Sequence, residues 1–289
     1  MTPVPLVNAF SVDVEDYFQV SAFEPHVGRD DWESLPHRVE ANTHRVLDLL
    51  AEFRVVGTFF VLGWVAERYP QVVHRLVAEG HELASHGYHH VRVTQQSPDD
   101  FYQDITRTKG LLEDTGGVAV RGYRAASYSI GATNLWALEQ LARSGHIYSS
   151  SIYPIRHDHY GMPEAPRFAF HPPNAPDLLE IPLSTVTVAG RNVPCGGGGY
   201  FRLLPYGVSR WLLARINSHE QRPCEFYFHP WEIDPGQPRI AGLDIKTRVR
   251  HYLNLGAMEG RLRRLLADFA WSRMDRVFLD WEALARDCP

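Results

Sequence analysis

Short apolar runs alternate along the chain with stretches whose apolar residues recur at helical spacing. Val7–Val12 and Val56–Leu62 are rich in β-branched or aromatic residues and predict buried strands. Between them, residues 37–53 place apolar side chains near helical spacing. Five further segments have the same strand pattern: Glu82–Ser85, Tyr123–Ala126, Ile147–Ser149, Cys224–His229 and Arg276–Leu279.

Helix boundaries are marked by proline and glycine. Pro70 precedes the apolar face of 71–79, and Ser97-Pro98 opens a helix that runs to about Thr115. Further helices are expected over 134–143, 206–218 and 244–269. Repeated alternation of strands and helices indicates an α/β fold built on a mostly parallel sheet or barrel.

The stretch from Tyr153 to Gly199 interrupts this rhythm and is rich in proline, histidine and glycine. We expect an insertion of long loops with little β structure, over about 153–205, beside the functional face. Gly196–Gly199 lacks the Lys-Ser/Thr of a phosphate loop, so we expect it to let the chain lie close to a substrate.

Composition narrows the class of protein. The 289 residues are 44% hydrophobic and 22% charged, as in globular proteins, and the net charge of −5 argues against nucleic acid as main partner. The apolar runs are shorter than the ~20 residues of a membrane helix. Residues 1–12 lack signal-peptide features, so we expect a cytoplasmic location, with the inner membrane surface as an alternative. Three scattered cysteines argue against disulfides and a cysteine zinc site.

Three carboxylates follow the first strand within four positions, at Asp13, Glu15 and Asp16. Like charges this close repel, and they are tolerated where a cation neutralises them or one acts as a tuned base. Strand alternation would put Asp13 and Glu15 on one face and point Asp16 away. A solvated loop that caps a helix is the alternative interpretation.

A histidine pair follows the predicted strand 82–85. His86 and His90 are four residues apart, which on a helical turn puts both imidazoles on one side. Two histidines and one carboxylate are a familiar catalytic set for zinc and other first-row metals. The pair alone is weak evidence, but the acid cluster also lies at a strand end, where barrel active sites assemble.

Two later strand ends carry candidate groups. Arg124 could hold a catalytic carboxylate by paired hydrogen bonds, with a surface ion pair as the alternative. His229 could serve as a general acid and Trp231 could stack on a sugar ring. A histidine at the edge of the core with a packing tryptophan is the alternative here.

In this order, the four elements resemble the polysaccharide deacetylase family (NodB-homology domain, carbohydrate esterase family 4). Asp13 with Glu15 or Asp16 resembles the family's acid pair, and His86 and His90 resemble its His-x-x-x-His motif. Arg124–Ser127 and His229 resemble later motifs. Longer segments look like the subgroup encoded with exosortase and exopolysaccharide loci: Ser11–Val20, His157–Phe168, Gly196–Pro205 and Phe228–Ile233.

The resemblance implies one domain over 1–289, a distorted, TIM-like (β/α) barrel with a long loop insertion and a helical C-terminal extension over about 240–289. It implies a hydrolase that removes N-acetyl groups from sugars of an exopolysaccharide or its precursor and releases acetate. The partner would be an N-acetylated oligo- or polysaccharide. The cofactor would be a divalent metal, with Zn²⁺ ahead of Co²⁺, Ni²⁺ or Mn²⁺.

The resemblance also assigns roles to individual residues. His86, His90 and either Glu15 or Asp16 would hold the metal, with Glu15 favoured. Asp13, held by Arg124, would be the base and His229 the acid. The backbone N–H near Ser127 would stabilise the oxyanion, and Tyr200 and Trp231 would contact the sugar.

The chain departs from the family pattern at three places. Gly87 stands where the histidine motif usually has Ser or Thr. D-V-E-D at 13–16 replaces an adjacent acid pair, and Ser149–Ser151 occupies the place of an aspartate that supports the acid histidine. Asp158, Asp234 and Glu232 are the candidates to replace that aspartate.

Two other classes of function remain open. One is hydrolysis of another amide bond, small or cyclic, and the other is a catalytically silent sugar-binding subunit. The cations of 244–269 would suit anionic lipid or an acidic polymer, with a solvated helix face as the alternative.

Overall fold

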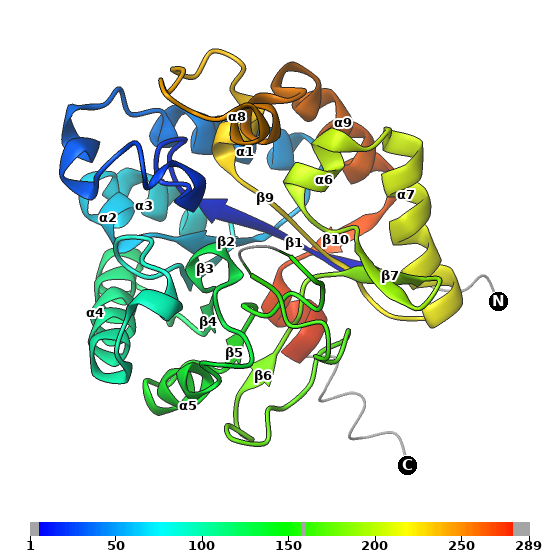
Figure 1. Ribbon diagram of the computed structural model, residues 1–289, viewed down its shortest axis with the longest axis horizontal. Coiled ribbons are helices and arrows are strands. Elements are labelled where there is room, and N and C mark those ends of the chain that lie inside the picture. Colours follow the sequence, from blue (N-terminus) through cyan, green and yellow to red (C-terminus); the bar gives the residue numbers. More distant parts are fainter. Residues whose placement is uncertain (1–5, 158–159, 280–289) are drawn as a thin grey trace.

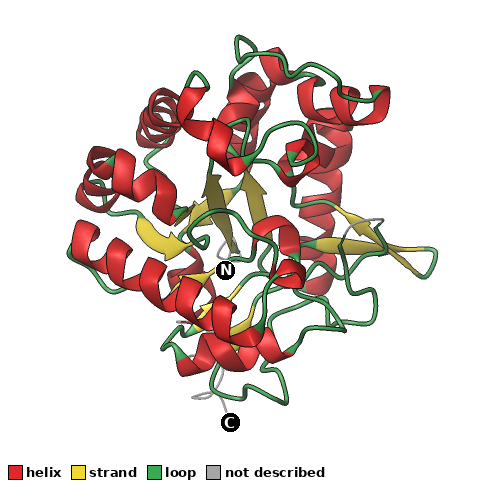
Figure 2. Cartoon of the chain, turned by 60° about the vertical axis from the view of Figure 1, so that its left-hand side comes forward, coloured by secondary structure: helices red, strands yellow, loops and turns green. Residues whose placement is uncertain are grey.

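A parallel eight-stranded sheet organises the computed structural model, which describes residues 6–157 and 160–279. The strands lie in the order β10-β1-β2-β3-β4-β5-β6, and β9 also pairs with β1. Helices surround the strands on the outside of the molecule (Figures 1 and 2). The strands of this sheet are β1 Val7–Val14, β2 Thr58–Val61, β3 Glu82–Ser85, β4 Gly122–Tyr123, β5 Tyr148–Ser149, β6 Leu179–Glu180, β9 Glu225–Phe228 and β10 Ala270–Ser272.

β1 is the central strand because three strands pair with it. Its first part pairs with β10, its middle with β9, and its last four residues with β2. Residues 8–14 are all buried, which explains the nearly continuous apolar pattern. Since all these pairings are parallel, the carboxyl ends of the strands meet at one edge, where the predicted site residues follow.

The helices agree with the predicted pattern over most of the chain. For example, Ser97 caps the helix 98–116 by accepting the Asp100 amide, and Gly117 ends it with φ 65°. The helices are α1 Val39–Glu52, α2 Gly63–Arg68, α3 Pro70–Ala78, α4 Pro98–Gly116, α5 Trp136–Arg143, α6 Gly198–Leu203, α7 Tyr206–Arg215, α8 Ile245–Tyr252 and α9 Leu255–Asp268.

Two predicted elements are wrong. The expected strand Arg276–Leu279 is a π-helical turn, and the last strand among the described residues is Ala270–Ser272. A short apolar run is compatible with a strand or with a helical turn, and here Val277 and Phe278 are buried in a helical turn. The expected helix 244–269 is two helices, since Asn254 between them adopts a left-handed φ of 55°.

The insertion contains loops and little β structure, as expected. Besides β6, it holds an antiparallel hairpin of β7 (Thr185–Val188) and β8 (Arg191–Pro194), and it ends in α6. Across the described ranges, no helix combines the length and apolarity needed to cross a membrane.

Candidate active site

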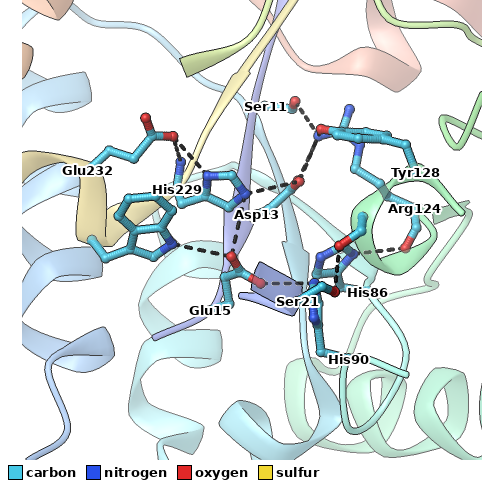
Figure 3. Close-up of polar contacts among 12 residues, drawn as sticks. Ser11, Asp13, Glu15, Ser21, His86, His90, Arg124, Tyr128, His229 and Glu232 are labelled. Carbon is cyan, nitrogen blue, oxygen red and sulfur yellow. Dashed lines mark hydrogen bonds and ion pairs between the residues drawn. The ribbon is translucent and has the colours of Figure 1, made fainter. Parts of the chain in front are cut away.

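Glu15, His86 and His90 converge at the carboxyl edge of the sheet (Figure 3). One potential donor atom of each lies within 4.8 Å of the others, and all three side chains are buried. Glu15 Oε2 is 3.0 Å from His90 Nε2. Two imidazoles and a carboxylate are a donor set that zinc and related divalent metals accept, so these residues fit the metal that the resemblance implies.

The loop after β3 brings the two histidines together by a different local structure from the helical turn expected. Gly87 has φ 73° and His90 has φ 52°, so the chain turns back twice through left-handed conformations. The carbonyl oxygens of Gly87 and Tyr88 accept the first amides of α2, which anchors the loop.

His86 is held as a neutral imidazole. Its Nδ1 lies 2.8 Å from the Arg124 carbonyl oxygen, which can only accept, so Nδ1 carries the proton. Burial lowers the pKa of His86 to about 4. Nε2 therefore keeps a lone pair, which is the form that binds metals.

Glu15 is ionised although it is buried. Burial alone would raise its pKa, but the charges of His90 and His229 and the hydrogen bond from His90 outweigh burial and hold the pKa at about 2. Trp231 Nε1 donates to Glu15 Oε1 over 3.2 Å. The carboxylate is thus charged and oriented toward the histidines.

Asp16, the alternative metal ligand, lies apart from this cluster. Its Oδ1 accepts from the Tyr17 amide, and its Oδ2 accepts from the amides of Arg38 and Val39 at the start of α1. Burial raises the pKa of Asp16 to about 6. Asp16 therefore has the helix-capping role, while strand alternation places Glu15 beside the histidines.

Asp13 lies at the end of β1 and pairs with Arg124. Arg124 Nη1 donates to Asp13 Oδ1 over 2.6 Å, and Nη2 donates to Glu225 over 2.8 Å. The surface-ion-pair interpretation of Arg124 is wrong, because its side chain is fully buried. Asp13 Oδ2 accepts from Tyr128 over 3.3 Å and lies 4.0 Å from His229 Nε2. Arg124 thus fixes one oxygen and leaves the other facing the site.

Glu232 supports His229, which answers the question left by the missing aspartate. His229 Nδ1 is 2.8 Å from Glu232 Oε1, and its side chain is one fifth exposed. Burial lowers the pKa of His229, but Glu15, Glu232 and Asp13 outweigh it and raise the value to about 9. Asp234 pairs with Arg38 instead, and Asp158 lies outside the described residues.

Trp231 does not offer a face to a sugar, so that prediction is wrong. Its ring stacks on His229 on one side (centroids 5.1 Å apart) and on His251 on the other (4.2 Å), and the residue is 5% exposed. An indole enclosed on both faces orients its neighbours instead of binding a ligand.

The structure places Ser127 three residues after Arg124 and Tyr200 within α6. Ser127 has a left-handed φ of 52°, and its Oγ is 2.6 Å from that of Ser21. Tyr200 lies on α6 near Tyr153 and Tyr160.

An aromatic cluster that was not predicted lies beside Asp13. Tyr128 and Tyr227 lie edge to face, 4.9 Å between centroids, and Tyr153 packs against Tyr128. These tyrosines come from three separate segments of the sequence. Only Tyr128 could have been predicted to lie near the site, because it follows Arg124 by four residues.

The parallel sheet and the polar cluster at its carboxyl edge define a (β/α) barrel with a candidate active site at its strand ends. Residues 30–145 match the family model described as polysaccharide deacetylase, and residues 150–279 match a domain of unknown function (DUF3473). Residues 30–145 thus form a polysaccharide deacetylase domain.

Curated relatives match over part of their length. A peptidoglycan-N-acetylglucosamine deacetylase of Bacillus cereus is 34% identical over 99 residues, which are 34% of this chain and 36% of the relative. A chitooligosaccharide deacetylase of Bradyrhizobium sp. is 31% identical over 111 residues, which are 38% of this chain and 48% of the relative. The matched segments thus span less than half of either relative.

Solved structures share the fold over nearly the whole chain. A protein of Mycobacterium smegmatis described as a polysaccharide deacetylase has a TM-score of 0.63 at 19% identity, covering 99% of this chain and 93% of its own. The PuuE allantoinase has a TM-score of 0.61 at 15% identity, with 96% and 90% covered. The expected distorted barrel is therefore confirmed.

Proposed function

We propose that this protein is a metal-dependent deacetylase that removes N-acetyl groups from sugars of an exopolysaccharide or its precursor and releases acetate. One observation carries the proposal: Glu15, His86 and His90 form a metal-type donor set directly beside Asp13 and His229. The relatives' names support an N-acetylated amino sugar as substrate. The exopolysaccharide assignment depends on the subgroup resemblance alone.

Glu15, His86 and His90 would hold the divalent ion, Zn²⁺ in first place. When bound, such an ion supplies Lewis-acid polarisation of a carbonyl and lowers the pKa of water. The residues of the chain supply the proton transfers, which an amide needs because the amine must leave protonated.

Asp13 would act as the base. Arg124 holds Oδ1, and Oδ2, which accepts only the long 3.3 Å hydrogen bond from Tyr128, would take a proton from the attacking water. The amide near Ser127 would donate to the oxyanion.

His229 would act as the acid. Glu232 holds Nδ1, and Nε2 lies 3.5 Å from Glu15 and 4.0 Å from Asp13, so the proton on Nε2 faces the site. Because the pKa of His229 is raised, this proton is present at neutral pH and can pass to the departing nitrogen.

An acetate-release screen tests the proposal. Purified protein with added Zn²⁺, Co²⁺ or Mn²⁺ is incubated with N-acetylhexosamine oligomers and, separately, with small and cyclic amides. We expect acetate from the oligomers, loss of activity and of bound metal in His86→Ala, and neither loss in His89→Ala. His89 is a matched control because it lies in the same loop outside the donor cluster. Turnover of cyclic amides alone would favour the second class of hydrolase, and full activity of His86→Ala would refute the metal assignment.

A further inference from the structure

Arg202 on α6 is a buried arginine that contacts Glu232, the carboxylate bound to the candidate acid His229. Its Nε donates to Glu232 Oε2 over 2.6 Å. Its other nitrogens donate to carbonyl oxygens at the end of α8: Nη1 to His251 and Leu253, and Nη2 to Arg250. The residue is 2% exposed. The planar fork therefore joins the carboxylate behind His229 to the C-terminal turn of α8.

Both carboxylate oxygens of Glu232 accept hydrogen bonds. One oxygen accepts both the backbone amide of His229 (3.1 Å) and its ring Nδ1 (2.8 Å), and the other accepts Arg202. Glu232 is completely buried, and a carboxylate with both oxygens bound in fixed directions cannot turn.

Gly198, within the glycine run 196–199, lies directly against Glu232. A Cβ at Gly198 would lie 2.3 Å from Glu232 Oε1 and 2.6 Å from Oε2. Only glycine lets the first turn of α6 approach the carboxylate that closely, and this approach brings Arg202 within reach of it.

The other side of the acid is also fixed by the C-terminal half of the chain. Trp231 stacks between His229 and His251, with interplanar angles of 16° and 12°. His251 is itself held by Gln237, at 2.7 Å from its Nε2. Arg202 binds the His251 carbonyl, so the stack and the ion pair meet at the same turn of α8.

We propose that Arg202 is a positioning residue for His229, acting through Glu232, and that the region matched to DUF3473 completes the active site in this way. The inference rests on the proposed deacetylase function. Arg202 fixes Glu232, Glu232 fixes the Nδ1 proton of His229, and Nε2 is thereby aimed at the substrate nitrogen.

Arg261 provides a matched control. It is a partly buried arginine that also holds α6, donating to the carbonyl oxygens of Phe201, Arg202 and Leu204, and no contact to Glu232 is found for it within 6–157 and 160–279. If Arg202 only ties helices together, loss of either arginine should have the same consequence.

The test is a kinetic cycle of Arg202→Met, Glu232→Gln and the double variant, with Arg261→Met beside it. We expect Arg202→Met to lower kcat by about 10–100-fold, as outer-shell changes do, with KM and bound metal little changed. The double variant should lose no more than Glu232→Gln alone, because Arg202 acts through that carboxylate. Arg261→Met should lower thermal stability and leave kcat of the folded protein within about threefold.

A second readout needs no turnover. In protein labelled with ¹⁵N-histidine, the Nδ1–H signal of His229, assigned by its loss in His229→Gln, should shift in Arg202→Met and stay in place in Arg261→Met. If neither the parent protein nor any variant releases acetate, the proposed function is refuted. If the His229 signal is unchanged in Arg202→Met, the positioning role is refuted. If Arg202→Met does not fold, Arg202→Lys replaces it. Unaltered kcat, or multiplicative losses in the double variant, would overturn the proposal.

Discussion

Asp13 has one carboxylate oxygen bound to a buried guanidinium and the other 4.0 Å from His229. In Asp13→Asn, the side chain can still accept from Arg124 but can no longer take a proton. We expect kcat for acetate release to fall by about 10²–10⁴-fold, the usual contribution of a general base, with metal content unchanged.

Glu225→Gln is the control for that variant. Glu225 is the other carboxylate on Arg124, and it is buried at the start of β9. The Glu225→Gln variant should unfold at a lower temperature than the parent and keep most of its kcat. If Asp13→Asn keeps full activity, or if Glu225→Gln is equally inactive, Asp13 is not the base.

For individual residues, the sequence predicted the direction of those side chains that strand alternation determines. Alternation along β1 favoured Glu15 over Asp16, and the structure places them accordingly. Glu232 was one of three candidates to support His229, and the structure places it there. The contact of Arg202 with Glu232 could not be predicted, because Arg202 comes from a separate helix, 27 positions before His229 in the sequence. Trp231 was misassigned because its second stacking partner, His251, lies 20 residues further along the chain.

Asp16 connects the end of β1 to the start of α1. Its Oδ2 accepts two amides, of Arg38 and Val39, that otherwise have no acceptor in the first turn. Asp16→Ala should therefore lower the free energy of unfolding by about 1–2 kcal/mol in urea denaturation, with metal stoichiometry unchanged. Loss of the bound metal in a folded Asp16→Ala protein would contradict this assignment.

His146, which follows α5, makes the stability of this element depend on pH. Burial lowers its pKa from 6.5 to about 3, and its Nδ1 contacts Ser144 Oγ at 2.8 Å. Between these two values the unfolded chain binds a proton that the folded chain does not. The free energy of unfolding therefore falls as the pH falls below 6.5, by at most about 1.4 kcal/mol per pH unit.

His146→Asn keeps a polar group that can hydrogen-bond Ser144 and removes the titration. Urea denaturation of both proteins from about pH 7 to about pH 4.5 measures the difference. The stability of the parent relative to the variant should decline on acidification. Parallel pH profiles would contradict the prediction.

Helices and strands were predicted well where their own residues carry a cap, a terminator or a buried apolar run. The capped and terminated helix α4 and the buried strands β1, β2 and β3 are of this kind. The break between α8 and α9 was missed because asparagine, which tolerates a left-handed conformation, lacks the clear signal of proline or glycine. The turn at 275–279 was missed because burial, and not periodicity, explains its apolar residues.

At the scale of the whole molecule, the cations of the C-terminal region separate into two groups. Those of α9 have partners within the chain: Arg261 binds carbonyls of α6, Arg263 pairs with Glu52 and Glu259, and Arg264 lies over the Tyr206 ring. On α8, Ile245 is 76% and Val249 50% exposed. Exposed cations flank them: Lys246, Arg248 and Arg250.

We therefore expect α8 to be the part of the surface that meets anionic lipid. Binding to vesicles with phosphatidylglycerol should weaken with added salt and in the Ile245→Ser/Val249→Ser variant. Val118→Ser, at another exposed apolar residue, should bind as the parent does. Equal binding to neutral vesicles, or no effect of the α8 changes, would contradict the expectation.

The assembly of the site is a property of the whole chain. β9 and β10 join β1 from more than 210 residues away, so the acid histidine and the base meet only once the sheet is complete. Sequence order could indicate a barrel with its site at the strand ends, but not which side chains would touch across that edge.

Metal titration tests the central claim most directly. The chelated protein is titrated with Co²⁺ and then Zn²⁺, and visible absorption, bound metal and acetate release are measured on the same samples. We predict one ion per chain, acetate release that rises in proportion to occupancy, and loss of both signals in Glu15→Ala, His86→Ala and His90→Ala. Full activity of the metal-free protein, or unchanged metal binding in those three variants, would contradict the account.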